Sequence, residues 1–203
     1  MKTTYKNDDS FFTIIIPPRC VYGFWTFHKW FQENSVAKFR VIRDSEVEED
    51  RLTLTQVDDI YPGIRTIGVV MNPWARIFYA YTQSILNTQS QKMIALRYSG
   101  IDFSSFENYV PSLMNCKTID SKVLPPTTNQ IHWVAKDGKL VNNLIRIEQV
   151  HADFKPLQEY FCTNSPLEVD DFSIDYQPHY STKNKNLIKK IFKQDIEQFG
   201  YSF

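Results

Sequence analysis

The sequence predicts an α/β fold with a central, mostly parallel sheet. Short runs of apolar and β-branched residues alternate with helix-like stretches along the 203 residues, which is the order expected of such a fold. The run IRTIGVV at residues 64–70 is almost continuously apolar from Ile67, as in a central strand of a parallel sheet. The length suits one domain or at most two small ones, and we expect a single domain over residues 1–203.

Each element has a local signal. Strands are expected from short apolar or alternating runs, at residues 11–16, 36–43, 64–70 and 140–148. Helices are expected from apolar residues at helical spacing, at residues 24–31, from Pro73 to Gln83 or beyond, at 105–110, at 150–161 and at 184–200. Asn72 is a good N-cap for the helix that starts at Pro73, Asp137-Gly138 is a turn signal, and Gly200 is a C-cap.

Composition excludes several classes of protein. The formal net charge is zero, which argues against a chain that binds nucleic acid by bulk charge. Cys20, Cys116 and Cys162 are far apart and form no CxxC pair, which fits a reducing compartment. The four histidines lack the spacing of zinc ligands, so no metal is expected. The N-terminus has no apolar signal core and no apolar run reaches the length of a membrane span, so we expect a cytoplasmic protein.

Two strand-to-helix junctions are candidates for ligand binding, residues 17–24 and residues 71–76. In a parallel sheet, ligands bind outside the carboxyl ends of the strands, where a helix N-terminus favours an anion. Arg19 adds a fixed charge to the first junction, and Gly23 lets the backbone approach a ligand closely. The loop PPRCVYG lacks the Gly-Lys-Ser/Thr ending of a Walker loop, and an ordinary β–α turn explains the same residues.

Four stretches, in this order, carry a further pattern: FTIIIPPRCVYGF, VVMNPWARIFYAY, QIHWVAKDGKLVNNLIRIEQVHADFKPL and IKKIFKQDIEQFGYSF. With them the chain resembles the sulfotransferase family, in the branch that contains many carbohydrate and bacterial or phage members. The resemblance implies a P-loop-NTPase-like three-layer α/β/α fold. It also implies transfer of a sulfonate group from 3′-phosphoadenosine-5′-phosphosulfate (PAPS) to an acceptor hydroxyl.

The resemblance also assigns the nucleotide-binding residues. Arg19 stands where the family has a lysine that binds the 5′-phosphate and helps the leaving group, and the loop around it consists of Cys20, Val21, Tyr22, Gly23 and Phe24. Met71 and Tyr79 stand where the family has an arginine and a serine that bind the 3′-phosphate. A thioether cannot replace a guanidinium, but Lys183 or Lys185 could supply the missing charge. Both lie in QPHYSTKNK, which with His179 resembles a family loop near the nucleotide.

Sulfonate transfer needs a base for the acceptor hydroxyl and cationic donors for the transferring group, and it needs no metal. The family often takes its base from the loop after the second strand, which suggests Asp44 or Glu46, and His132 is another candidate. A solvated acidic loop and a packed or surface histidine explain the same residues. Arg76 is expected to bind a buried carboxylate, with Glu148 as its partner, and a direct contact with the nucleotide is the second choice.

The function predicted from the sequence is therefore a sulfotransferase whose acceptor is a carbohydrate hydroxyl. The alternative is a catalytically inactive protein that keeps the sulfotransferase fold as a binding or interaction module, which the substitutions at Met71 and Tyr79 favour. A kinase-like enzyme is disfavoured, because both junctions lack the Gly-Lys-Ser/Thr loop and an aspartate for magnesium.

Overall fold

The structure is a mixed α/β fold, rich in helix and with a small sheet that is partly parallel. This computed structural model describes residues 2–7, 10–15, 40–42, 65–87, 92, 94–96, 98–119, 125–160, 167 and 174–203. The chain divides into two compact units. Unit 1 consists of Met1–Met71 and Gln130–Ser173, and unit 2 consists of Asn72–Asn129 and Ile174–Phe203. Each unit is therefore built from two separate stretches of chain.

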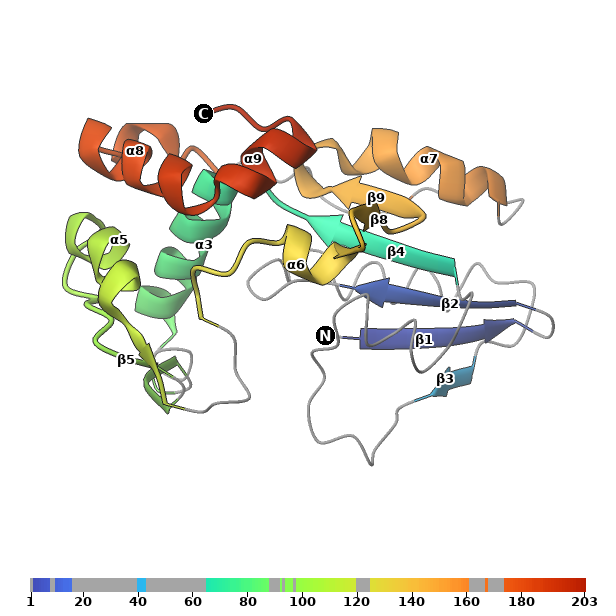
Figure 1. The fold of residues 1–203 in the computed structure, drawn as a ribbon, viewed down its shortest axis with the longest axis horizontal. Helices are drawn as coiled ribbons and strands as arrows, with labels where there is room; N and C mark the ends of the chain where they lie inside the picture. Colours follow the sequence, from blue (N-terminus) through green and yellow to red (C-terminus); the bar gives the residue numbers. More distant parts are fainter. Residues whose placement is uncertain are drawn as a thin grey trace. The chain divides into compact units, whose positions relative to one another are not determined.

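Unit 1 contains a five-stranded sheet in the order β3-β1-β2-β4-β9, as far as the described residues show (Figure 1). Its strands are β1 (Lys2–Asn7), β2 (Ser10–Ile15), β3 (Arg40–Ile42), β4 (Arg65–Val70) and β9 (Asn143–Arg146). β4 pairs in parallel with β2 and β9, whereas β1 is antiparallel to both of its neighbours. The prediction of a central parallel strand at residues 64–70 is confirmed. The polar strand β1 was not predicted.

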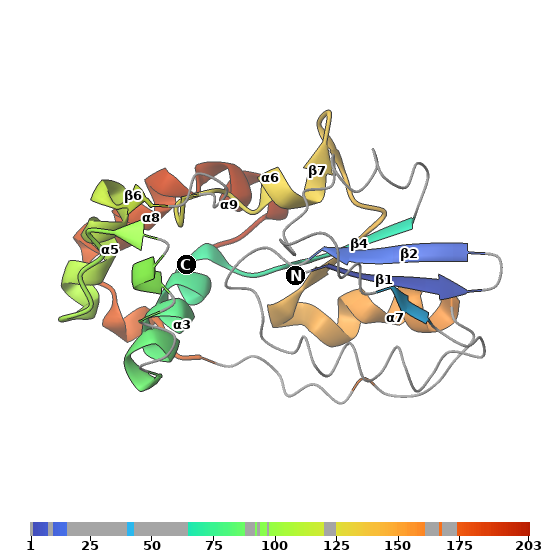
Figure 2. The same ribbon diagram turned by 90° about the horizontal axis from the view of Figure 1, so that it is seen from below.

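The second stretch of unit 1 covers this sheet. It contains α6 (Ile131–Val134), β7 (Ala135–Lys136), β8 (Lys139–Leu140), the 3-10 turn η1 (Ile147–Gln149) and α7 (Val150–Tyr160). β7 and β8 form a hairpin whose two loop residues, Asp137 and Gly138, have φ of 50° and 74°, so the predicted turn is confirmed. Figure 2 shows α7 on one side of the sheet and this hairpin on the other.

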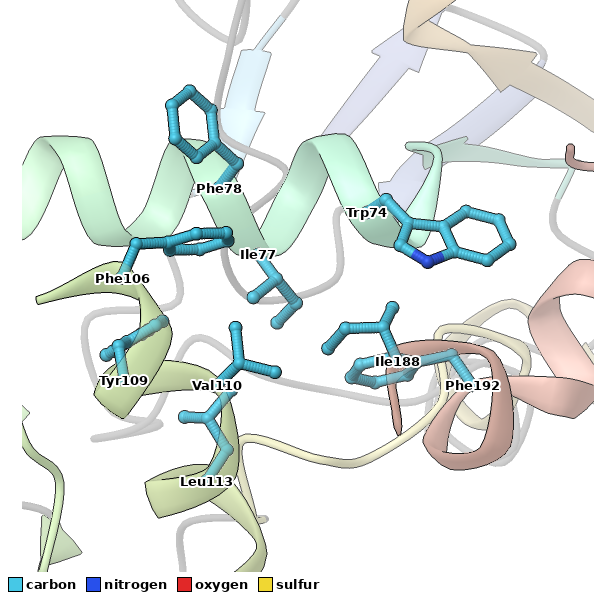
Figure 3. Packing of buried hydrophobic residues seen from close by; sticks show 9 residues of the cluster. All are labelled: Trp74, Ile77, Phe78, Phe106, Tyr109, Val110, Leu113, Ile188 and Phe192. Atoms are coloured by element: carbon cyan, nitrogen blue, oxygen red, sulfur yellow. The ribbon is translucent and has the colours of Figure 1, made fainter. Parts of the chain in front are cut away.

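Unit 2 is mainly helical. Its elements are α3 (Pro73–Leu86), β5 (Tyr98–Ser99), α5 (Phe106–Asn115), β6 (Lys117–Thr118), the 3-10 turn η2 (Gln177–His179), α8 (Thr182–Ile191) and α9 (Lys193–Phe199). Its core joins α3 and α5 to α8 and the residue that follows it, and Ile77, Val110 and Ile188 point into the space between these helices (Figure 3). The core residues are Trp74, Ile77, Phe78, Phe106, Tyr109, Val110, Leu113, Ile188 and Phe192.

The C-terminal helix differs from its prediction. Apolar spacing predicted one helix over residues 184–200, but the backbone breaks at Phe192, where ψ is 31°, and divides it into α8 and α9. Phe192 is fully buried and lies in the core of unit 2. The periodicity continues through the break, so the pattern alone could not reveal it. Gly200 ends α9 in the left-handed conformation, with φ of 71°, which confirms the predicted C-cap.

Candidate functional site

The first junction, residues 17–24, lies outside the residues that the structure describes. Its loop residues, together with the acidic residues after the second strand, lie outside the described part of the chain: Arg19, Cys20, Val21, Tyr22, Gly23, Phe24, Asp44 and Glu46. Their assignments to the 5′-phosphate and to the catalytic base stay predictions. The predicted helix at residues 24–31 also lies there. The second junction is described completely, and the site is built on it.

The backbone of Met71, directly after β4, is held by a single side chain. The Gln130 carboxamide accepts a hydrogen bond from the Met71 N–H at 2.9 Å and donates one to the Met71 carbonyl at 2.7 Å. Met71 and Gln130 are both fully buried. The Met71 thioether is therefore enclosed at this strand end. Gln130 begins one of the four stretches that resemble sulfotransferases. Its contact with Met71 could not be predicted from local sequence, because the two residues are 59 positions apart.

The N-terminus of α3 is capped as predicted. The Asn72 side-chain oxygen accepts from the Trp74 N–H at 3.0 Å, and Pro73 occupies the first helical position. The Asn72 amide donates to the Ser202 carbonyl at 2.9 Å, which ties the cap to the last residues of the chain. No acidic residue lies in the first turn. The positive end of the helix dipole is therefore not compensated by a carboxylate of that turn.

Arg76 lies in this first turn and is only 3% exposed. Its guanidinium carbon lies 4.6 Å from the centroid of the Phe192 ring, a cation–π distance. The Nε and Nη2 atoms are buried and have no hydrogen-bond partner among the described residues. Glu148, its expected partner, is exposed in η1 and belongs to the other unit, so that pair stays a prediction.

Residues 179–185 are docked on α3 within unit 2. The Tyr180 hydroxyl donates to the Trp74 carbonyl at 2.9 Å, and the Trp74 indole N–H donates to the Lys185 carbonyl at 3.0 Å. The exposed His179 ring stacks on Phe78 at 4.5 Å between centroids. The segment that resembles the family loop near the nucleotide therefore lies against the first turns of α3.

The cationic and hydroxyl groups proposed for the 3′-phosphate have different surroundings. Tyr79 is half-buried on α3, and Lys183 is exposed in the first turn of α8. The Lys185 ammonium lies 3.9 Å from the centroid of the Phe203 ring, where a cation–π contact holds it. The structure therefore brings residues 179–185 onto α3, the helix that contains Tyr79.

His132 lies in unit 1, on the short helix α6. Its ring is exposed and meets the buried Trp133 ring edge-on, with centroids 6.1 Å apart. The role of His132 as a base stays a prediction.

Within the described residues, no three His, Cys, Asp or Glu side chains gather as a metal site, and no helix there combines the length and apolarity that a membrane span requires. Comparison with protein-family models, with curated proteins and with solved structures found no match. The resemblance to sulfotransferases therefore depends on the four sequence stretches.

Proposed function

We propose that this chain is a sulfotransferase that moves a sulfonate group from PAPS to a hydroxyl of a carbohydrate acceptor. The observation that carries the proposal is the second junction. Central strand β4 leads directly into the Asn72-Pro73 cap of α3, whose first turn contains a buried arginine and no carboxylate. Such a helix N-terminus suits a phosphate group. On this proposal, β2, β4 and β9 belong to a P-loop-like three-layer α/β/α fold.

The reaction follows from in-line displacement at sulfur. The acceptor oxygen attacks the sulfur, its proton passes to a base, and the S–O bond to the 5′-phosphate breaks, which leaves a sulfate ester and 3′-phosphoadenosine-5′-phosphate. Arg19 would stabilise the charge on the departing phosphate, and backbone N–H groups of residues 20–24 would surround it. Asp44, Glu46 and His132 are the candidate bases.

The second candidate function is a non-catalytic binding module with the same fold. Met71 favours it, because the side chain at this position is apolar and fully buried and provides no charge for a phosphate. Loss of one charged hydrogen bond to a phosphate costs on the order of 1.5–3 kcal/mol, or roughly a tenfold to hundredfold loss of affinity. A nucleotide could still bind if another cation replaces the missing one.

Isothermal titration calorimetry distinguishes the two functions. We expect 3′-phosphoadenosine-5′-phosphate to bind in the micromolar range and adenosine 5′-phosphate to bind clearly more weakly. Arg19→Ala should lower the affinity for both nucleotides, because Arg19 is assigned to the 5′-phosphate that they share. Equal binding of the two nucleotides, or no binding of either at millimolar concentration, would contradict the proposed sulfotransferase function. A positive result leads to a screen of carbohydrate acceptors with PAPS.

A further inference from the structure

Arg146 and Arg76 differ in what the Nε and Nη2 atoms of the guanidinium group contact. Arg146 donates from Nε and Nη2 to the two carboxylate oxygens of Asp153, each at 2.8 Å. This side-on arrangement is the bidentate geometry that an arginine offers to an oxyanion. In Arg76 the same two atoms are buried, and the part of the chain that the structure describes offers them no hydrogen-bond acceptor. The Asp153 contact therefore serves as an internal reference for what the Arg76 edge could bind.

An arginine edge buried without a partner is unusual. Buried polar groups in folded proteins are nearly always hydrogen-bonded, and an exception suggests a bound ion, a water or a functional role. The Phe192 ring lies 4.6 Å from the Arg76 guanidinium carbon and stabilises the cation, but a cation–π contact supplies no oxygen acceptor for Nε and Nη2. This edge therefore lacks an acceptor.

The surroundings favour an anion. Arg76 is in the first turn of α3, where the helix dipole is positive and where no acidic residue is present. Long side chains on a helix lean toward its N-terminus, so the guanidinium charge and the dipole act at the same end. Asn72, which caps this end, and Phe192 belong to the same compact unit as Arg76. Together they form a cationic corner that unit 2 supplies alone.

We propose that Arg76 binds a tetrahedral oxyanion through its Nε–Nη2 edge at the N-terminus of α3. This inference deepens the proposed function and rests on it for the identity of the ligand. In a sulfotransferase the oxyanion is the 3′-phosphate of the nucleotide, and Arg76 replaces the charge that is missing at Met71. The new assignment is that the residue that binds the phosphate lies at Arg76, further along the chain than Met71, the position that the resemblance to sulfotransferases indicates.

The test compares Arg76→Gln with the wild-type protein by titration with both nucleotides. We expect Arg76→Gln to lower the affinity for 3′-phosphoadenosine-5′-phosphate roughly tenfold to a hundredfold. The affinity for adenosine 5′-phosphate should stay unchanged. The matched control is Lys190→Gln, which removes the same charge from an exposed position on α8. If Arg76→Gln does not fold, Arg76→Lys keeps the charge without the planar fork, and a smaller loss in the same direction is expected. An unchanged preference for the 3′-phosphate would overturn the assignment.

A second measurement separates this inference from the proposed function. If wild-type protein does not discriminate between the nucleotides, the melting temperature is measured with inorganic phosphate or sulfate at constant ionic strength. A rise in the wild type and in Lys190→Gln, but not in Arg76→Gln, would support an oxyanion site in a protein that is not a sulfotransferase. An equal rise in all three proteins, or no rise in any, would overturn the site.

Discussion

At the scale of single residues, Gln130 holds the end of the central strand. A carboxamide carries an acceptor and donors side by side, so one side chain can satisfy both the N–H and the carbonyl of the same residue. Gln130 does this for Met71, and all four groups are buried. Asn72, the next residue, then begins the cap of α3. The backbone of Met71 and the first turn of α3 are therefore each held by a side-chain amide, from Gln130 and Asn72 respectively.

Gln130→Leu should destabilise the fold, because it leaves the Met71 N–H and carbonyl without their side-chain partner. The expected cost is about 1–3 kcal/mol for each unpaired backbone group, measured by urea unfolding. Gln130→Glu is the informative companion. The introduced carboxyl group can donate to the Met71 carbonyl only when it is protonated, so folding raises the pKa of this group. The stability of the Gln130→Glu protein should therefore fall as pH rises. A Gln130→Leu variant as stable as the wild type would contradict this role.

Tyr180 predicts a pH dependence of stability. Burial, together with Tyr109 and Tyr176 nearby, raises the pKa of its hydroxyl above the ordinary value of 10.0. Because the folded-state pKa is the higher one, the stabilisation is complete below pH 10.0 and is lost as pH rises further. Tyr180→Phe removes the hydrogen bond to the Trp74 carbonyl and should cost about 0.5–1.5 kcal/mol at pH 7. In denaturant unfolding that deficit should shrink at pH 11, and a constant deficit would argue against the shift.

At the scale of elements, local signals predicted the parts of the fold that local chemistry determines. The Asn72-Pro73 cap, the Asp137-Gly138 turn and the Gly200 cap each depend on a few adjacent residues, and all three are confirmed. The break between α8 and α9 was missed, because Phe192 keeps the helical spacing of apolar residues while its backbone leaves the helix. Its cause is burial against distant elements, which no short window contains.

Gly68 is another element-scale feature that the apolar pattern did not reveal. It lies in β4, and a Cβ there would meet Val134 Cγ1 and Val141 Cγ2, each at 2.9 Å. The segment from α6 to the residue after β8 therefore packs on this strand at a distance that only glycine allows.

Gly68→Ala should destabilise the protein by about 1–3 kcal/mol through overpacking. Val134→Ala, which removes one of the two contacting methyl groups, should recover part of this loss in the double variant, although alone it creates a cavity. Urea unfolding of the four proteins in a double-mutant cycle measures the coupling. Strictly additive effects would show that the two side chains do not compete for the same space.

At the scale of the whole molecule, the sequence predicted less. Alternating strands and helices indicated an α/β fold, and its mixed α/β character is confirmed, with β4 as an interior strand between two parallel neighbours. The association of Asn72–Asn129 with Ile174–Phe203 could not be predicted, because periodicity shows which face of a helix is apolar but not which helix covers it. The same limit applies to the candidate site. Arg76 was expected to pair with a carboxylate. Its contact with Phe192 could not be predicted, because the two residues are 116 positions apart in the sequence.

Because unit 2 is assembled from two stretches, a chain that ends at Ser173 should lose its helical core. The truncation removes Ile188 and Phe192, which are both fully buried against α3 and α5. We expect amide hydrogens of α3 and α5 to exchange rapidly in the truncated chain and slowly in the full-length one. In the full-length protein, Phe192→Ala should cost about 3–5 kcal/mol, whereas Ile119→Ser at a side chain that is 59% exposed should change little. Slow exchange in α3 after truncation would show that residues 72–129 fold without the C-terminal helices.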